Sequence, residues 1–154
     1  MNVGLEENRV YMYLENSGID KYRFDINAEK KEEINKIISK FIEWNRKASY
    51  NGVKLSKDMG SLIIDLYYED GGKWVSSSSQ WNFRFFSKSE KVHQIIIAID
   101  KESLKDKSVY KLIPNEIYIG WDSAIYLLNS LDDKNIDKAI KNRAYKRVIE
   151  KEFE

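Results

Sequence analysis

The sequence predicts an α+β fold in which one antiparallel β-meander sheet is packed by one long helix and two C-terminal helices. The stretch from 61 to 100 holds the longest apolar run, IIIAI at 95–99, together with the densest cluster of aromatic residues. The segments on either side of it carry apolar residues at helical spacing. Runs of strands beside separate runs of helices are typical of α+β domains, so we expect roughly five to seven strands. The length suits a single domain over residues 1–154.

The N-terminal region is expected to form a β-hairpin. Its two strand-like runs, VYMYL at 10–14 and YRF at 22–24, flank the turn residues Asn16-Ser17-Gly18. A helix that begins at Leu5 and is capped by Gly18 is the competing interpretation, because apolar residues of this stretch would also share one helical face.

A long amphipathic helix is predicted near residues 28–48. Asn27 suits the N-cap position, and acidic residues follow in the first turns, where the helix dipole favours them. Asn51-Gly52 provides a C-terminal stop, while Trp44 falls outside the apolar stripe. That stripe repeats at i, i+3, i+4, i+7 and i+8 and comprises Ile34, Ile37, Ile38, Phe41 and Ile42. We expect it to lie across one face of the sheet.

The centre of the sheet is expected to be a hairpin. SLIIDLYYE at 61–69 is strand-like, and Gly71-Gly72 is a two-residue turn signal, because a type I′ turn needs positive φ at both central residues. This register sets Tyr68 opposite Val75 and Glu69 opposite Trp74. The face predicted to line the core carries Leu62, Ile64, Leu66, Tyr68 and Val75.

Two further strands are predicted at 81–87 and 92–100, and the second is apolar on both faces, as covered strands are. The serine run at 76–79 is interpreted as a loop or a strand end, and 52–60 as a loop. An additional edge strand is expected at 108–113, before Pro114.

The C-terminal third is expected to hold two helices. The first begins around Trp121, with Ala124, Ile125 and Leu128 on the same face. The second is capped by Asp132 or Asp133, and the side chains expected to point inward are Ile136, Ile140, Ala144 and Val148.

The second face of the sheet mixes large apolar side chains with charges. Tyr67, Trp74 and Ile96 lie there among Asp65, Glu69 and Arg84. Such a face is either covered by helices or offered to a partner, and covered sheets are the commoner case. Trp74 is too large and apolar to stay in water without some cover, so either a C-terminal helix or a partner is expected to pack on it.

Composition bounds the compartment and the class of partner. The absence of cysteine excludes disulfides and thiolate metal sites and is compatible with a reducing compartment. The N-terminus lacks the features of a signal peptide, and no apolar run approaches the ~20 residues of a membrane span. We therefore expect a cytoplasmic protein with no membrane association. A net charge of +1 argues against a dedicated nucleic-acid binder.

No recognised catalytic or cofactor-binding pattern is present, so we expect no enzymatic activity, cofactor or metal site. The motifs G-x-S-x-G, G-x-x-x-x-G-K-[ST] and G-x-G-x-x-G are all missing. The single histidine, His93, lies within an apolar strand, where a histidine is usually a core residue. Asp65 and Glu69 share a strand face but lie about 13 Å apart, which is wider than the carboxylate pairs of glycosidases.

The last predicted helix contains a basic stretch. Six basic residues and one acid lie between Lys134 and Arg147. Such a run usually forms a solvated face, although it can also follow phosphates. An alternative function is therefore that of a nucleic-acid-binding accessory protein that uses Lys138, Lys141 and Arg143.

The chain resembles the small cytoplasmic immunity proteins of bacterial toxin systems, including contact-dependent inhibition. The resemblance lies in the sum of a meander, SLIIDLYYEDGGKW…WNFRFF…HQIIIAID, flanked by amphipathic helices and rich in leftover tyrosines and acids. It implies a non-enzymatic protein inhibitor that binds a cognate toxin and blocks its active site. Small phage-encoded inhibitors have the same appearance. The resemblance assigns no site residues, because no motif carries it.

The partner-binding site is expected on the second sheet face and at the tip of the central hairpin. If the toxin is a nuclease, its substrate groove is basic, so acidic and aromatic side chains would steer association and supply hot spots. The residues predicted to bind the partner are Asp65, Tyr67, Glu69, Asp70, Trp74 and Arg84. The sequence leaves the oligomeric state open.

Overall fold

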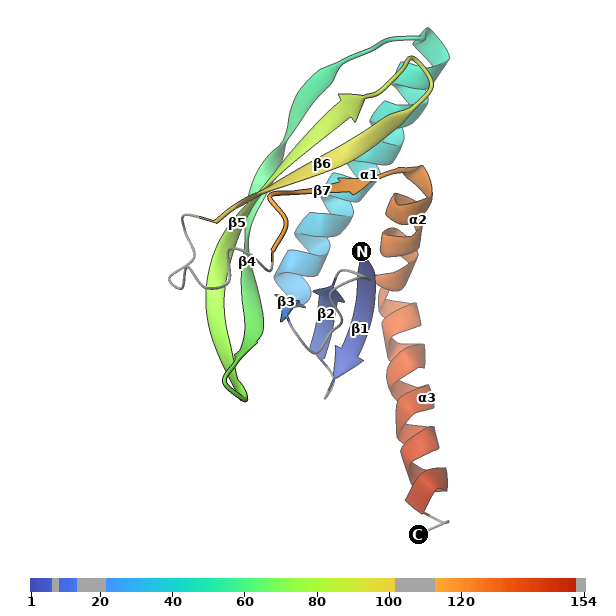
Figure 1. Ribbon diagram of the computed structural model, residues 1–154. Coiled ribbons are helices and arrows are strands. Elements are labelled where there is room, and N and C mark those ends of the chain that lie inside the picture. The colour runs from blue at the N-terminus through green and yellow to red at the C-terminus, as the bar shows by residue number, and fades with distance from the viewer. Residues whose placement is uncertain (7–8, 14–21, 102–112, 152–154) are drawn as a thin grey trace.

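The computed structural model describes residues 1–6, 9–13, 22–101 and 113–151, and within them it confirms the α+β meander (Figure 1). The described strands form one seven-stranded antiparallel sheet in the order β1-β2-β3-β4-β5-β6-β7, so every strand pairs with its neighbours in the chain. The elements are β1 (Asn2–Glu6), β2 (Arg9–Tyr13), β3 (Tyr22–Ile26), α1 (Ala28–Asn51), β4 (Ser56–Asp70), β5 (Lys73–Ser87), β6 (His93–Asp100), β7 (Glu116–Ile119), α2 (Trp121–Ser130) and α3 (Asp133–Lys151).

The N-terminal region is built of strands where it is described. β2 pairs with β3 through Val10↔Ile26 and Met12↔Phe24, which confirms the pairing expected of the hairpin. Its turn residues, Asn16-Ser17-Gly18, lie outside the described residues. The competing helix from Leu5 is wrong over the described part, because Val10 and Met12 alternate toward the core as a strand requires. The sequence did not predict β1, whose segment NVGLE contains a glycine and none of the aromatic residues that made β2 and β3 recognisable.

α1 follows its predicted signals closely. The side chain of Asn27 accepts a hydrogen bond from the Lys30 N–H at 2.9 Å, and Gly52 ends the helix in the left-handed region with φ 62°. The helix runs three residues beyond the predicted 28–48. Four members of the predicted stripe are buried, namely Ile34, Ile37, Ile38 and Phe41, while Ile42 is partly buried.

β4 and β5 form the expected hairpin with the expected register, Tyr68↔Val75 and Glu69↔Trp74. Gly71 and Gly72 adopt φ values of 56° and 81°, as a type I′ turn requires. Each strand is 15 residues long, so two sequence interpretations were wrong. The loop at 52–60 is shorter, because β4 already begins at Ser56 and continues through an irregularity between Asp58 and Gly60.

The serine run is part of β5, contrary to the predicted loop. Ser77 and Ser79 point to the inner face and are buried there. The Ser79 hydroxyl oxygen accepts a hydrogen bond from Trp81 Nε1 at 3.1 Å, and the same hydroxyl donates to the Ile64 carbonyl at 3.4 Å. These small polar side chains leave room for the Trp81 ring and are paired, which is why low strand propensity did not break the strand.

The last described strand, β7, was not predicted from the sequence. Most of the expected edge strand at 108–113 falls outside the described residues, and its final residue, Ile113, lies in a bend. β7 instead follows Pro114 and pairs with β6 through Ile95↔Ile119 and Ile97↔Ile117. Its four residues are too few for a period-2 pattern to stand out.

The two C-terminal helices are confirmed, with one correction to the packing of the second. Asp132 caps α3, since its Oδ1 accepts hydrogen bonds from the Lys134 and Asn135 N–H groups at 3.0 and 3.3 Å. Ile136 and Ile140 are half-buried as expected, but Ala144 and Val148 are exposed. The reason is that the far end of α3 extends past the sheet, so its side chains have no neighbouring element to pack against (Figure 1).

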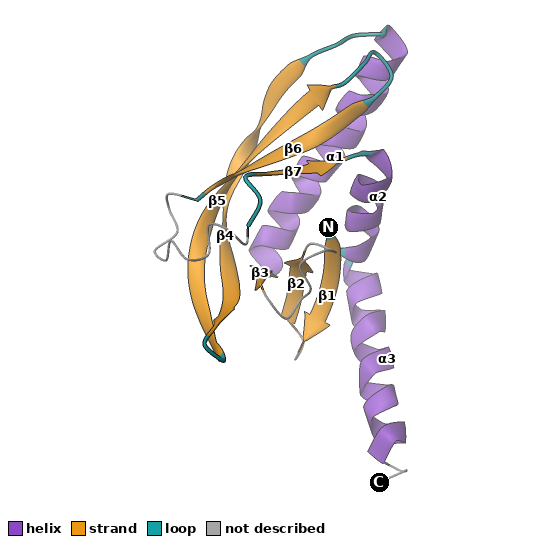
Figure 2. Cartoon of the chain, viewed as in Figure 1, coloured by secondary structure: helices purple, strands orange, loops and turns teal. Residues whose placement is uncertain are grey.

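The core lies between α1 and the sheet face that the sequence identified. Ile64, Leu66 and Tyr68 are buried there, and the Trp81 ring meets Phe24 edge-on at 4.6 Å between centroids. α1 contacts β3, β4 and β6, and α2 contacts α1 and β1. Figure 2 shows the helices gathered to one side of the long strands β4 to β6. The opposite face of β3, β4 and β5, here called the outer face, therefore has no helix across it in the described structure.

Candidate protein-binding surface

The outer face brings together side chains from β3, β4 and β5 that lie far apart in the sequence. The cross-strand register sets Arg23 beside Tyr67, Asp25 beside Asp65, and Glu69 beside Trp74. Asp65 and Glu69 are exposed, Tyr67 is half-buried, and 45% of the Trp74 surface is exposed. A tryptophan with this much exposed surface on an uncovered sheet face is unusual, because large aromatic side chains are normally buried.

Arg23 holds the aromatic side chains of this surface in place. Its guanidinium carbon lies 4.3 Å from the ring centroid of Tyr11 and 4.3 Å from that of Trp74. Cation–π contacts of this kind stabilise by about 0.5–1 kcal/mol at exposed sites. Tyr11, on β2, is buried beneath the outer face. The cover that Trp74 requires thus comes in part from a charged side chain rather than from a helix.

Asp25 and Asp65 face each other across β3 and β4. Partial burial raises the pKa of Asp25 above its usual value, and the negative charge of Asp65 raises it further. The positive charges of Arg9 and Arg23 act in the opposite direction without reversing the shift. The outer face therefore contains two neighbouring carboxylates, one of them with a raised pKa, beside its aromatic patch.

Four of the predicted site residues lie in this surface, namely Asp65, Tyr67, Glu69 and Trp74. Asp70 adjoins them at the hairpin tip, where it is exposed opposite Lys73. Arg84 lies on the same face but further along β5, opposite Ile96, and its guanidinium is 3.9 Å from Glu116. Sequence reasoning missed Arg23, Asp25 and Tyr11. Their alternation with buried neighbours was visible, but the register that places them beside Trp74 was not.

The single histidine is a core residue. His93 is buried, its ring stacks on Phe85 with centroids 5.2 Å apart, and its Nδ1 lies 2.8 Å from the Ser87 hydroxyl oxygen. Burial lowers the pKa of His93, against a smaller opposing effect from the backbone of Glu90. Its Nε2 has no hydrogen-bond partner among the described residues. Within the same part of the chain, no group of three or more histidine or carboxylate side chains is arranged to hold a metal ion.

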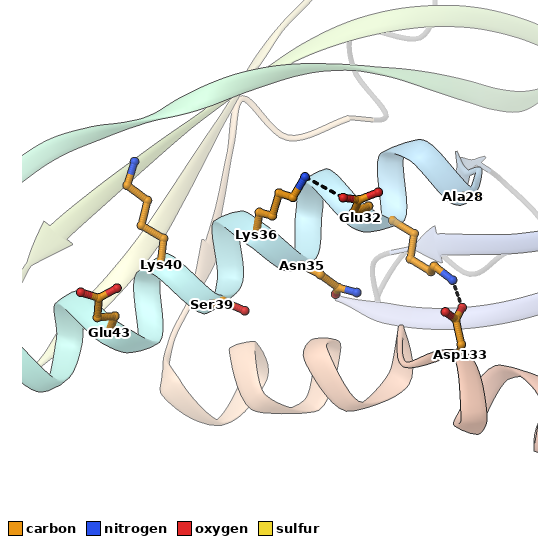
Figure 3. A pocket seen from close by; sticks show the side chains of 9 residues that line it. Ala28, Glu32, Asn35, Lys36, Ser39, Lys40, Glu43 and Asp133 are labelled. Carbon is orange, nitrogen blue, oxygen red and sulfur yellow. Dashed lines mark hydrogen bonds and ion pairs between the residues drawn. The ribbon is translucent and has the colours of Figure 1, made fainter.

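A second hollow, of about 780 Å³, follows the side of α1 near the start of α3 (Figure 3). Its charged side chains, apart from Lys40, are already paired within the protein. Lys31 forms an ion pair with Asp133, and Lys36 lies 2.6 Å from Glu32. A ligand would have to compete with these pairs, so this hollow is a weaker candidate site than the outer face.

The basic helix predicted as an alternative site projects from the molecule. Lys138 and Lys141 on α3 are exposed. Arg143 differs, because its guanidinium donates a hydrogen bond to the Leu5 carbonyl and so ties α3 to the edge strand β1. The three predicted nucleic-acid residues therefore do not have equivalent surroundings.

Comparison with protein-family models, with curated proteins and with solved structures finds no significant match to this chain. None of the described helices combines the length and the apolarity needed to cross a bilayer.

Proposed function

We propose that this protein is a non-enzymatic inhibitor, an immunity protein that binds a cognate bacterial toxin and blocks its active site. The observation that carries the proposal is Trp74, which is 45% exposed on a helix-free sheet face and held by Arg23. Hot spots of protein interfaces are enriched in Trp, Tyr and Arg that lie close together. A preformed cluster loses little side-chain entropy on binding.

The charges around Trp74 favour a basic partner. Glu69 and Asp70 are exposed beside it at the hairpin tip, and Asp65 is exposed further along β4. Acidic groups accelerate association with a positively charged groove, such as the one in which a nuclease binds its substrate. An inhibitor that presents carboxylates beside a large aromatic ring would occupy such a groove in place of the phosphates.

The test is whether a toxin is encoded immediately upstream of this gene and whether that toxin binds this protein. We expect the two proteins to co-purify and the complex to lack toxin activity. Trp74→Ala should weaken binding by about 2 kcal/mol or more and leave the melting temperature nearly unchanged. Tyr50→Ala is the matched control, since Tyr50 is 90% exposed at the end of α1, away from the outer face.

Two results would contradict the proposal. One is full affinity in Trp74→Ala. The other is a loss of roughly 3–5 kcal/mol of folding stability in that variant, which is the cost of removing a buried aromatic side chain. Absence of any toxin gene beside this one would favour the phage-type inhibitor, whose target lies elsewhere.

A second candidate function, nucleic-acid binding, rests on the exposed side of α3. Lys138 and Lys141 are exposed there, and no carboxylate pairs with them among the described residues. The double substitution Lys138→Glu and Lys141→Glu should abolish a gel shift at low salt if the helix follows phosphates. Arg143 is left intact, because its contact with Leu5 is structural. Lack of a gel shift by the parent protein at low salt would exclude this function.

A further inference from the structure

We propose that a groove between the C-terminal half of α1 and the start of β4 binds a small planar aromatic anion. The groove has a volume of about 400 Å³, which lies within the usual range of small-molecule sites. It is separate from the outer face, since α1 packs on the other face of the sheet. The inference therefore does not depend on the proposed toxin partner.

The walls of the groove are apolar. They are formed by Trp44 and Ala48 of α1 and by Val53 and Leu55 of the segment that leads into β4. The Trp44 ring packs edge-on against Phe85, with centroids 5.8 Å apart and planes at 70°. This contact fixes one wall in advance. Val53 is 43% exposed, so apolar surface stays accessible in the groove.

Two lysine ammonium groups flank the Trp44 wall of the groove: Lys57 lines the groove itself, and Lys40 lies beside it, on the turn of α1 that precedes Trp44. Lys57 stands opposite Phe85 in the sheet register, so the pleat directs it to the inner face, where apolar side chains are normal. Its Nζ lies 5.1 Å from the centroid of the Trp44 ring, and Lys40 Nζ lies 4.8 Å from the same centroid. Figure 3 shows Lys40 extending from α1 toward the sheet.

These two ammonium groups lack a carboxylate partner among the described residues. Lys47, which also lines the groove, differs because its Nζ lies 2.5 Å from Glu43. Lys40 and Lys57 thus combine uncompensated positive charge with an apolar hollow and one aromatic wall. The ligand that satisfies all three features has a flat aromatic body for the walls and an anionic group, a carboxylate, sulfonate or phosphate, for the ammonium groups.

The experiment is isothermal titration of the full chain with 8-anilinonaphthalene-1-sulfonate, a planar aromatic anion. We expect one molecule to bind per chain and to raise the melting temperature, since a ligand of the native state stabilises it. The double substitution Lys40→Gln and Lys57→Gln should weaken binding about tenfold or more, the loss expected for charge-assisted contacts. Lys73→Gln, at the exposed β4–β5 turn, is the matched control and should bind as the parent does.

Two further probes distinguish the contribution of the aromatic rings to binding from that of the anionic group. N-phenyl-1-naphthylamine, which has the same rings without the sulfonate, should bind about tenfold more weakly or worse, and sulfate alone should not bind measurably. The proposal is overturned if the neutral probe binds as tightly as the anion. It is equally overturned if the double variant keeps the affinity of the parent, or if Lys73→Gln loses as much affinity as the double variant does. Binding of the probe at many sites with a lowered melting temperature would also overturn it.

Discussion

Asp25 and Asp65 are the least favourable neighbours on the outer face. Like charges directly opposite each other on adjacent strands destabilise a sheet by roughly 0.2–1 kcal/mol. The pKa of Asp25 is raised chiefly by burial, and the charge of Asp65 adds to this effect. A basic group from a partner would relieve this repulsion on binding, which agrees with the charge expected of the toxin.

The first prediction concerns this pair. Asp25→Asn should raise the free energy of unfolding at pH 7 by roughly 0.2–1 kcal/mol, because the like-charge contact is lost. In the parent, the folded-state pKa of Asp25 is raised, so stability is lost as pH rises through that pKa. The advantage of the variant should therefore vanish at lower pH, where Asp25 itself is neutral. Urea denaturation over a pH series measures this, with Asp70→Asn as the control, and a less stable Asp25→Asn would show that Arg9 and Arg23 outweigh Asp65.

His93 provides a second prediction. Burial holds the pKa of His93 below its value of about 6.5 in an unfolded chain. As the pH falls below 6.5, the unfolded chain takes up a proton first, so stability should decrease until the pH reaches the folded-state pKa. His93→Gln should remove this decrease, whatever its stability at pH 7. An unchanged pH slope between pH 7.5 and 5 in this variant would refute the assignment, and full retention of function would confirm that His93 is not catalytic.

At the scale of elements, the sequence predicted the bounds and register best where one pattern of residues extended over a long segment. The N-cap, stripe and Gly52 stop of α1 all hold, and Gly71-Gly72 predicted both the turn and its register. β1 was missed because its segment contains a glycine and no aromatic residue, and β7 because its four residues are too few to stand out. Only part of the candidate site could be predicted from the sequence. Trp74 and its β4 neighbours follow from one hairpin, whereas Arg23 depends on the pairing of β3 with β4, which no local pattern contains.

α3 is longer than the part of it that packs on the rest of the molecule. The prediction is that a chain ending after Arg143 melts within a few degrees of the full chain, because Ala144, Tyr145 and Val148 are exposed. The shortened chain keeps the contact between Arg143 and Leu5. Ending the chain before Arg143 is the comparison and should lower the melting temperature further. A large loss from the first truncation alone would mean that the end of α3 packs on the body in solution.

At the scale of the whole molecule, the sheet separates two proposed sites. The outer face presents Trp74, while the groove beside Trp44 lies on the side of α1. The sites share no residue, and effects at separate sites are additive as a rule. Trp74→Ala should therefore bind 8-anilinonaphthalene-1-sulfonate as the parent does, and the Lys40→Gln, Lys57→Gln variant should bind the toxin normally. Titration of each variant with both partners measures this, and a change of more than about threefold in the remote affinity would indicate coupling through the sheet.

The order of the sheet also bears on how fast the chain finds its structure. Each described strand pairs with the next one in the chain, from β1 to β7, so the sheet contains no crossover, although α1 separates β3 from β4. Folding rates fall as contacts become more distant in sequence, because the entropy of loop closure must be lost before the contact forms. The β4–β5 hairpin combines a two-residue loop with the longest pairing, which makes it the natural nucleus, with β3 and β6 added on its two sides. In such an assembly, the strand edge left unpaired at each step is covered when the next strand along the chain is added.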